Sequence, residues 1–355
     1  MDFIKNGSEY VESLIAEGVK NGSRTATVTG NYEMAREVRI PSDFTLILAD
    51  CHLRMADGVY SNMFVNQNHD TELGGTLEGT DHNIAILGKG RAILDGGNYN
   101  GLSEKTHSKE GRPHVIKNCL VLFSNVDGVT VRNIACHNQR YWALNFVYCC
   151  NGHISDIDFK ANDLAIDPEG NEYHGLIRER YKEVVVKNAD GIDLRQGCHH
   201  FLIENITGFT EDDTIALTNL NMKGQNRSMF AVEGASSDIS HVMIRNIRAS
   251  SYCTIARLLN QGPVKIHDIT IEDVFDTSAD CPHLDHGKFA IRVGDAEYLY
   301  GERHSTAEET YNIKIRNITG RGYAVLHLAG AIGNISYENV SAMGQTELLQ
   351  DRRTV

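Results

Sequence analysis

The chain reads Asn188-Ala189-Asp190-Gly191-Ile192-Asp193 and, shortly downstream, Glu211-Asp212-Asp213. The pairs Asp190/Asp213, Ile192/Ile215 and Leu194/Leu217 are each separated by 23 residues. If that interval is one coil of a solenoid, the paired residues stack on neighbouring strands about 4.8 Å apart. The stacking would gather carboxylates on one face, where like charges raise one another's pKa.

A second pattern places Asn or Asp directly before an apolar residue at the end of short alternating segments such as 129–131 and 313–315. It recurs at Asn133, Asp156, Asn205, Asn246, Asp273, Asn317 and Asn339. The steps of 23, 49, 41, 27, 44 and 22 residues correspond to one or two coils. Asn and Asp tolerate the left-handed backbone region and form side-chain ladders between coils. We therefore predict an all-β fold, a single-stranded right-handed parallel β-helix of about ten coils.

The domain organisation follows from this repeat, because a solenoid grows by adding coils and needs no domain boundary. We predict one domain over residues 1–355, with a cap at 1–24, coils at 25–345 and a tail at 346–355. The cap contains an amphipathic helix at 8–20, with Ser8 as its N-cap and Gly22 just beyond its end. Early strands are expected at 25–29, 45–48 and 84–87.

Five polar, glycine-containing insertions interrupt the repeat, at 98–112, 163–183, 219–237, 276–288 and 295–310. They are long for plain turns, so we expect them to wall a substrate cleft. Loops that close the ends of a cleft favour exo action.

Composition restricts the class of partner. A formal net charge of −13 argues against nucleic acid and against broad capture of an acidic polymer. No apolar run reaches membrane-spanning length, and the first residues lack a signal-peptide pattern, so we expect a cytoplasmic protein without a membrane partner. The eight Cys show no paired metal spacing and are expected to be free, mostly buried thiols.

Several short segments follow one another along the chain in a specific order. They are Gly88-Lys89-Gly90, Ile93-Leu94-Asp95-Gly96-Gly97, Arg112-Pro113, Phe123, Val129-Thr130-Val131-Arg132-Asn133-Ile134, Trp142, Asn188-x-Asp190-Gly191-x-Asp193 and Asp212-Asp213. In this series the chain resembles the polygalacturonase-like, pectinase-type glycoside hydrolase family over about residues 82–217. The resemblance implies a pectin-lyase-like β-helix and an inverting hydrolysis without metal or cofactor. It places catalytic carboxylates at Asp190, Asp212 and Asp213, with Asp212 as general acid and the other two activating water.

The sequence departs from the family pattern twice. The Gly-His-Gly expected on the next coil falls near Ser251-Tyr252-Cys253, where no His is present. The Arg-x-Lys that holds a uronate carboxylate corresponds to Arg292-Val293-Gly294, where the Lys is absent. Losing one cation weakens carboxylate recognition. We therefore expect Gly294 to leave space where the Lys would sit, and unmodified polygalacturonate to be a poor substrate.

Other candidate substrate-binding residues are Asp193, Arg292, Tyr252, Arg257 and Trp142. Trp142 is either a sugar-stacking platform or a buried aromatic, and the Arg residues either face the cleft or are solvated. Arg195 and Tyr252 would serve as bases in a lyase. Among the His residues, His199 or His200 would approach the cleft. The loop bearing Cys281, His283, Asp285 and His286 does not specify a metal geometry, so no metal is predicted.

Three functions remain open from the sequence. The first is an inverting glycoside hydrolase acting on a plant-type oligo- or polysaccharide, for which a uronate-containing or modified pectic substrate and a neutral glycoside both stay open. The second is a polysaccharide lyase or uronate epimerase on the same fold. The third is a non-catalytic carbohydrate-binding β-helix, because fold does not determine function. The partner in each case is a carbohydrate, and the oligomeric state is left open.

Overall fold

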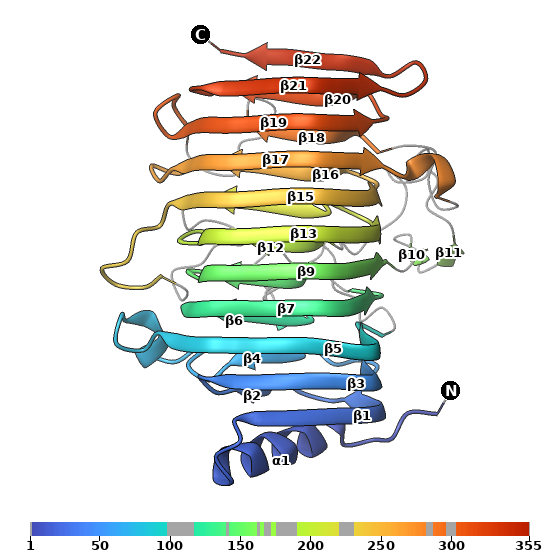
Figure 1. Cartoon of the computed structure of the whole chain (residues 1–355), viewed down its shortest axis with the longest axis vertical. Coiled ribbons are helices and arrows are strands. Elements are labelled where there is room, and N and C mark those ends of the chain that lie inside the picture. Colours follow the sequence, from blue (N-terminus) through green and yellow to red (C-terminus); the bar gives the residue numbers. More distant parts are fainter. Residues whose placement is uncertain are drawn as a thin grey trace.

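A computed structural model describes residues 2–97, 117–139, 142–161, 164–166, 172–174, 190–219, 231–281, 287–295 and 303–354. Two parallel sheets of ten strands each run the length of the molecule, and successive strands alternate between them (Figure 1). Each coil therefore contributes one strand to each sheet. This confirms the predicted parallel β-helix and its ten coils.

The first sheet, sheet A, contains the longer strands. They are β1 (Thr25–Met34), β3 (Phe44–Met55), β5 (Asp81–Asp95), β7 (Val126–His137), β9 (Cys150–Lys160), β13 (His199–Thr210), β15 (Ile239–Ser251), β17 (Ile266–Asp276), β19 (Thr310–Gly320) and β21 (Ile335–Ala342). The three early strands predicted from the sequence lie within β1, β3 and β5, and all three are longer than expected.

The second sheet, sheet B, contains shorter strands. They are β2 (Val38–Ile40), β4 (Phe64–Asn66), β6 (Val121–Ser124), β8 (Trp142–Val147), β12 (Asp190–Leu194), β14 (Ile215–Asn219), β16 (Thr254–Asn260), β18 (Phe289–Gly294), β20 (Ala324–Gly330) and β22 (Glu347–Arg353). Two short antiparallel strands, β10 (Leu164–Ile166) and β11 (Glu172–His174), lie outside both sheets, as do the 3₁₀ turns η1 (Leu73–Gly75) and η6 (Ser278–Asp280).

The core is a stack of apolar side chains between the sheets. Ile192 pairs with Ile215 and Leu194 with Leu217, which confirms the 23-residue register predicted from the sequence. All four side chains are buried in one continuous hydrophobic core. Because side chains alternate along a strand, the residues between them face outward from sheet B.

The Asn/Asp positions of the repeat adopt the predicted backbone. All seven have φ between 52° and 58°, in the left-handed region. Their side chains also form the predicted ladder: Asn205 Nδ2 donates to Asp156 Oδ1 (2.9 Å), and Asn246 Nδ2 donates to Asn205 Oδ1 (2.6 Å). Each amide therefore stabilises a turn and joins it to the neighbouring coil.

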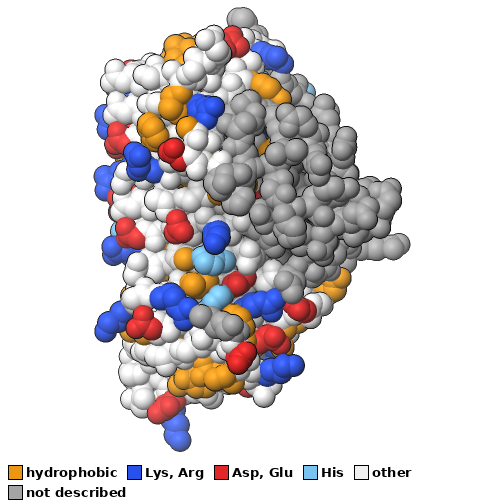
Figure 2. Space-filling model, turned by 90° about the vertical axis from the view of Figure 1, so that its right-hand side faces the viewer, with side chains coloured by type: hydrophobic (Ala, Val, Ile, Leu, Met, Phe, Trp, Pro, Cys, Tyr) orange, Lys and Arg blue, Asp and Glu red, His pale blue; other side chains and the backbone are white. Residues whose placement is uncertain are grey.

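A row of alternating charges crosses the outer face of sheet A. The strand register places Glu204, Arg245, Glu272 and Arg316 side by side, and ion pairs join Glu204 to Arg245 and Glu272 to Arg316. Opposite charges on neighbouring strands stabilise a sheet by up to about 1 kcal/mol a pair. On the face shown in Figure 2, acidic and basic side chains of the described residues are likewise interspersed, not separated by sign.

Helix α1 (Gly7–Lys20) covers the N-terminal end of the β-helix, as predicted (Figure 1). The predicted N-cap is wrong, because Asn6 occupies that position and makes no side-chain cap, whereas Ser8 lies within the helix. The Ser8 hydroxyl donates to the Arg36 carbonyl (2.8 Å) and accepts from the Arg36 amide (3.2 Å). Ser8 therefore ties the helix to the chain that follows β1.

The C-terminal residues differ from the predicted tail. Residues 347–353 form β22, which pairs in parallel with β20 as the last strand of sheet B. Its side chains alternate less clearly than in earlier strands because most are exposed at the end of the stack, and this weak pattern hid the strand in the sequence. Much of the five insertions predicted to wall a cleft lies outside the described residues.

The eight Cys are all free, and six of them are buried, in agreement with the prediction. Among the described residues, no helix is long and apolar enough to cross a membrane.

Candidate active site

The predicted catalytic carboxylates lie where the chain enters successive strands of sheet B. Asp190 begins β12, and Asp212 and Asp213 precede β14 on the next coil. The Gly191 amide donates to the Asp213 carbonyl (3.0 Å), and the Ile192 amide donates to the Thr214 carbonyl (2.9 Å). Backbone hydrogen bonding therefore holds the two turns side by side.

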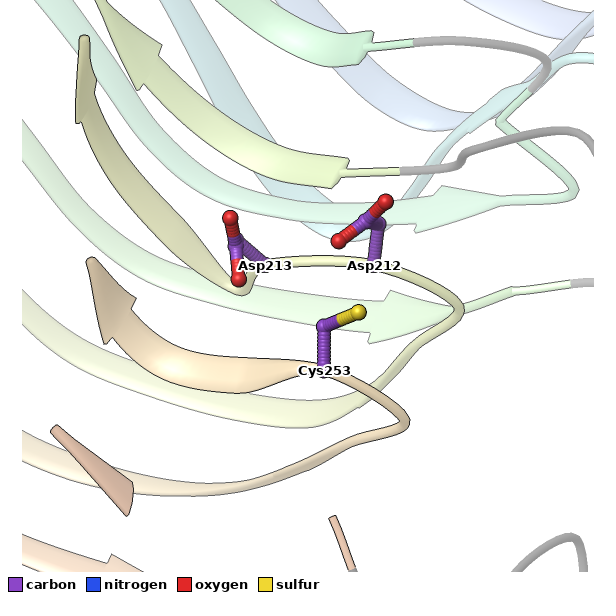
Figure 3. Close-up of side chains that lie close together, drawn as sticks. All are labelled: Asp212, Asp213 and Cys253. Carbon is purple, nitrogen blue, oxygen red and sulfur yellow. The ribbon is translucent and has the colours of Figure 1, made fainter. Parts of the chain in front are cut away.

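Asp212, Asp213 and Cys253 form a compact cluster. A carboxylate oxygen of each Asp and the Cys253 sulfur all lie within 4.8 Å of one another. Figure 3 shows the three side chains projecting into the same space from the turns before β14 and β16. Cys253 occupies the region where the family resemblance leads us to expect a His.

Two hydroxyl groups fix the backbone of this turn. Thr210 Oγ1 and Ser251 Oγ both donate to the Asp212 carbonyl, at 2.7 and 2.6 Å. Thr210 Oγ1 also hydrogen-bonds to Thr214 Oγ1 (2.9 Å). Because these contacts come from both sides of the turn, Asp212 is held in a defined position before any substrate binds.

Asp190 and Asp193 have perturbed acidity. Burial, followed by the charges of Asp193, Asp212 and Asp213, raises the pKa of Asp190 well above its usual range. Burial raises the pKa of Asp193 to about 7, although Arg195 opposes the shift. Since the charges of Asp193, Asp212 and Asp213 all raise the pKa of Asp190, the predicted acids converge on one site, where the two buried acids, Asp190 and Asp193, titrate as a pair.

Three carboxylate oxygens of the site, on Asp190, Asp193 and Asp213, are buried and have no hydrogen-bond partner among the residues that the structure describes. Buried polar atoms without partners are uncommon in folded proteins and concentrate at functional sites. The arrangement therefore favours a chemical role for these acids over a purely structural turn.

Arg195, which the sequence analysis names as a base for the alternative lyase function, lies next to the buried acids. Its guanidinium Nη2 donates to Asp193 Oδ1 (2.7 Å), and its Cζ lies 4.2 Å from the centre of the Trp142 ring. Arg195 and Trp142 are both buried. In this arrangement the Trp142 ring supports Arg195, so the sugar-stacking role does not match the observed burial.

The other predicted cations lie on the outer face of sheet B. Arg257 Nη1 forms an ion pair with Asp213 Oδ2 (3.3 Å). Arg292 on β18 is the register partner of Arg257. Arg292 is buried, with Cζ 5.8 Å from the Phe289 ring centre. Its contact with a sugar stays a prediction, whereas Arg257 directly touches a candidate catalytic acid.

The expectation that Gly294 leaves space for a lysine is wrong. Gly294 has φ of 101°, and a Cβ built on it would lie 1.6 Å from the Ala329 carbonyl oxygen. The neighbouring coil approaches so closely that only glycine fits. The lysine is therefore missing at a position where the backbone of this chain has no room for a side chain.

Tyr252 is buried beside Lys288, whose ammonium lies 5.5 Å from the ring centre. Lys288 Nζ also donates to Cys253 Sγ (3.1 Å). Lys288 was not predicted from the sequence as a member of the site. The spacing of the coils could have revealed it. The interval from Ile215 to its partner Ala256 is also the interval from Asp212 to Cys253. The interval from Ala256 to its partner Ile291 likewise leads from Cys253 to Lys288.

The remaining predicted features do not join the site. His199 and His200 begin β13 of sheet A, after β12 has ended, and His200 stacks on the ring of His241 at 4.6 Å. His283, Asp285 and His286 lie outside the described residues. Within the described part of the chain, the single cluster of metal-ligand type is Asp212, Asp213 and Cys253.

Asp193 gives a testable dependence of stability on pH. Its pKa of about 7 in the folded chain exceeds the ordinary carboxyl value, so the folded state retains a proton that the unfolded chain releases. The stability from this proton is complete below the unfolded pKa and is lost as the pH rises through the folded pKa. We expect the free energy of unfolding of the wild type, relative to Asp193→Asn, to fall between about pH 4 and 7, by up to about 1.4 kcal/mol per pH unit.

Urea unfolding of both proteins across this range measures the difference. A difference that stays constant from pH 4 to pH 8 would contradict the assigned protonation of Asp193.

This chain is similar to known glycoside hydrolases in sequence and in fold. The family model for glycosyl hydrolases family 28 matches residues 34–234, more than half of the chain. No curated protein matches. An endo-xylogalacturonan hydrolase from Aspergillus tubingensis is 12% identical, with a TM-score of 0.60 over 98% of this chain and 93% of its own.

Two further solved structures are similar. An exopolygalacturonase from Thermotoga maritima is 14% identical, with a TM-score of 0.54 over 96% of this chain and 86% of its own. A polygalacturonase from Erwinia carotovora ssp. carotovora is 11% identical, with a TM-score of 0.55 over 98% of this chain and 96% of its own. At these identities the likeness concerns the fold, and it confirms the right-handed parallel β-helix.

Proposed function

Because the chain belongs to glycosyl hydrolases family 28 and is a glycoside hydrolase, we propose that it cleaves a pectic oligo- or polysaccharide with inversion of configuration. The observation that carries the proposal is that Asp190, Asp212 and Asp213 lie together at the turns that lead into β12 and β14. The charges of Asp212 and Asp213 also raise the pKa of Asp190. Inverting hydrolysis requires one carboxylic acid to protonate the leaving oxygen and one carboxylate to activate water.

Asp212 is proposed as the general acid. Its carboxyl group is less buried than its neighbours, and its backbone is held by two hydroxyl groups. Asp190 and Asp213 would activate the water on the opposite face of the sugar. For that reaction the two carboxyl groups that act as acid and base should lie roughly 6.5–9.5 Å apart across the bond. Oxygens of Asp212 and Asp213 approach within 4.8 Å, so Asp190 is the proposed base partner of Asp212, and Asp213 assists in holding the water.

The raised pKa of Asp190 must be reconciled with its proposed role as a base. Asp190 and Asp193 are both buried and both have a raised pKa, and Arg195 neutralises part of the charge on Asp193. At neutral pH the pair therefore shares a proton. Activity that depends on Asp190 as a base should rise with pH as this pair loses that proton.

The proposed substrate class rests on the relatives and on the cations of the site. The similar structures are named as hydrolases of polygalacturonan and xylogalacturonan. Arg257 and Arg292 lie side by side on the outer face of sheet B, next to the acids. A pectic chain with modified or decorated uronates matches this arrangement better than bare polygalacturonate, because the second cation of the uronate clamp is replaced by Gly294.

Activity on a panel of pectic oligosaccharides tests the proposal. We expect new reducing ends without ultraviolet absorbance from unsaturated uronates, inverted configuration in the first product by proton NMR, and slower cleavage of unmodified polygalacturonate than of a decorated pectin. Absorbance together with reducing ends would identify a lyase, and binding without either signal a non-catalytic protein. Rapid cleavage of polygalacturonate would contradict the predicted preference.

We also propose that the protein works in the cytoplasm on short oligosaccharides, and that it is exo-acting. Six buried thiols among eight free Cys are typical of proteins from a reducing compartment.

A further inference from the structure

Three residues of successive coils occupy the same position at the turn that leads into sheet B. They are Asp212 before β14, Cys253 before β16 and Lys288 before β18, and they are related when the register of these strands is continued back by three residues from Ile215, Ala256 and Ile291. The Lys288 amide donates to the Cys253 carbonyl (2.9 Å), which holds the last two turns together. The side chains are therefore stacked along the axis of the β-helix.

In this column, formed by Asp212, Cys253 and Lys288, the side chains on either side both approach the Cys253 sulfur. Lys288 Nζ donates to Cys253 Sγ (3.1 Å), and the sulfur lies within 4.8 Å of carboxylate oxygens of Asp212 and Asp213. Cys253 is buried, and its amide donates to Ser251 Oγ (2.9 Å), the same hydroxyl that binds the Asp212 carbonyl. The thiol is thus fixed between an ammonium and the carboxylates of the site.

The protonation of the thiol follows from this environment. Burial, and then the charge of Asp212, raises the pKa of Cys253 well above its usual range, while Lys288 opposes the shift. The sulfur therefore keeps its proton at neutral pH. The sulfur accepts from Lys288 Nζ, and its S–H group lies beside the Asp212 carboxyl group, within 4.8 Å of one of its oxygens.

We propose that Cys253 and Lys288 are positioning residues for Asp212, and that the thiol links the Lys288 ammonium to this carboxyl group. The inference rests on the proposed function of Asp212 as general acid. When Asp212 gives its proton to the leaving oxygen, it becomes a carboxylate. The S–H donor and the ammonium behind it stabilise that carboxylate, so proton transfer becomes easier.

The direction of the effect is set by charge. A cation near a carboxyl group favours the ionised form and lowers its pKa. Removing Lys288 should therefore make Asp212 a weaker acid. Because a general acid must be protonated to act, the alkaline limb of the pH profile should move to higher pH as kcat falls.

Kinetics of Lys288→Met test this. We expect kcat to fall about tenfold and the alkaline limb to rise by about one pH unit. The matched control is Lys314→Met, which removes the same charge from an exposed position on β19 in sheet A. Cys253→Ala should behave like Lys288→Met, and Cys253→Ser should restore part of the activity, since a hydroxyl both donates and accepts.

A second measurement needs no substrate and keeps the inference separate from the proposed function. The rate of Cys253 alkylation by iodoacetamide, followed by peptide mapping, reports the thiolate population. We expect Asp212→Asn to speed alkylation and Lys288→Met to slow it, each by about tenfold per unit of thiol pKa change, with Lys314→Met unchanged.

Alkylation rates that do not respond to either substitution would overturn the link between the three residues. If the rates respond but Lys288→Met and Cys253→Ser both keep the wild-type kcat and pH profile, the positioning role is wrong. If hydrolysis is undetectable on every substrate while the alkylation rates respond as expected, the proposed function fails and the positioning role fails with it, although the linkage of the three residues stands.

Discussion

Separate substitutions Asp190→Asn, Asp212→Asn and Asp213→Asn are each expected to lower kcat by about a hundredfold or more. Asparagine keeps the size of the side chain but can neither donate the carboxyl proton nor carry the negative charge. The three residues lie on turns that are held by backbone hydrogen bonds, so the fold should persist. Initial rates of reducing-end release on the best substrate of the panel provide the measurement.

The control for this series is Asp280→Asn, an exposed acid in η6 whose loss should leave kcat unchanged. Circular dichroism and thermal melting of each variant separate loss of chemistry from loss of fold. Near-normal turnover in all three acid variants would show that the site has been placed wrongly.

Gly294→Lys should restore the lysine of the family pattern in sequence but not in function. A side chain at this position collides with the Ala329 carbonyl at 1.6 Å and must adopt φ of 101°. Backbone strain and a forced shift of the adjoining coil together should lower the free energy of unfolding by about 3 kcal/mol or more. Denaturant unfolding of the variant measures this loss.

Gly344→Lys is the matched control for Gly294→Lys. Gly344 also has positive φ, 67°, but a Cβ there meets nothing within 4 Å. We expect a loss of only about 1–2 kcal/mol, the cost of the backbone conformation alone. If Gly294→Lys were as stable as the wild type and gained activity on polygalacturonate, position 294 would have room for a lysine side chain, and the steric argument would be wrong.

The repeat was the part of the fold that the sequence predicted best. Asn and Asp residues in left-handed turns and the 23-residue pairing of β12 with β14 depend on local backbone preferences and strict side-chain alternation, both of which are readable in one dimension. The tail at 346–355 was wrong because an end strand has one neighbour and exposes its side chains, which removes the alternation. Ser8 was misplaced because its partner, Arg36, is distant in sequence.

The candidate acids were also predictable, because Asp190 and Asp213 lie one uninterrupted coil apart. Cys253 and Lys288 were harder to find, since insertions of different length separate each from the previous member of the column. Only the strand register shows that they share a position with Asp212. The position of Arg195 depends on its contact with the Trp142 ring, and the need for glycine at 294 depends on the nearby Ala329 carbonyl. Sequence spacing does not predict either contact.

The column of Asp212, Cys253 and Lys288 bears on how such an enzyme changes during evolution. Each coil supplies one side chain to the column, and each coil is held mainly by its immediate neighbours. A single substitution can therefore alter one point along the bound chain while the coils on either side keep their backbones. Divergence of specificity can proceed coil by coil, with the acids of one turn kept and the residues of the next exchanged.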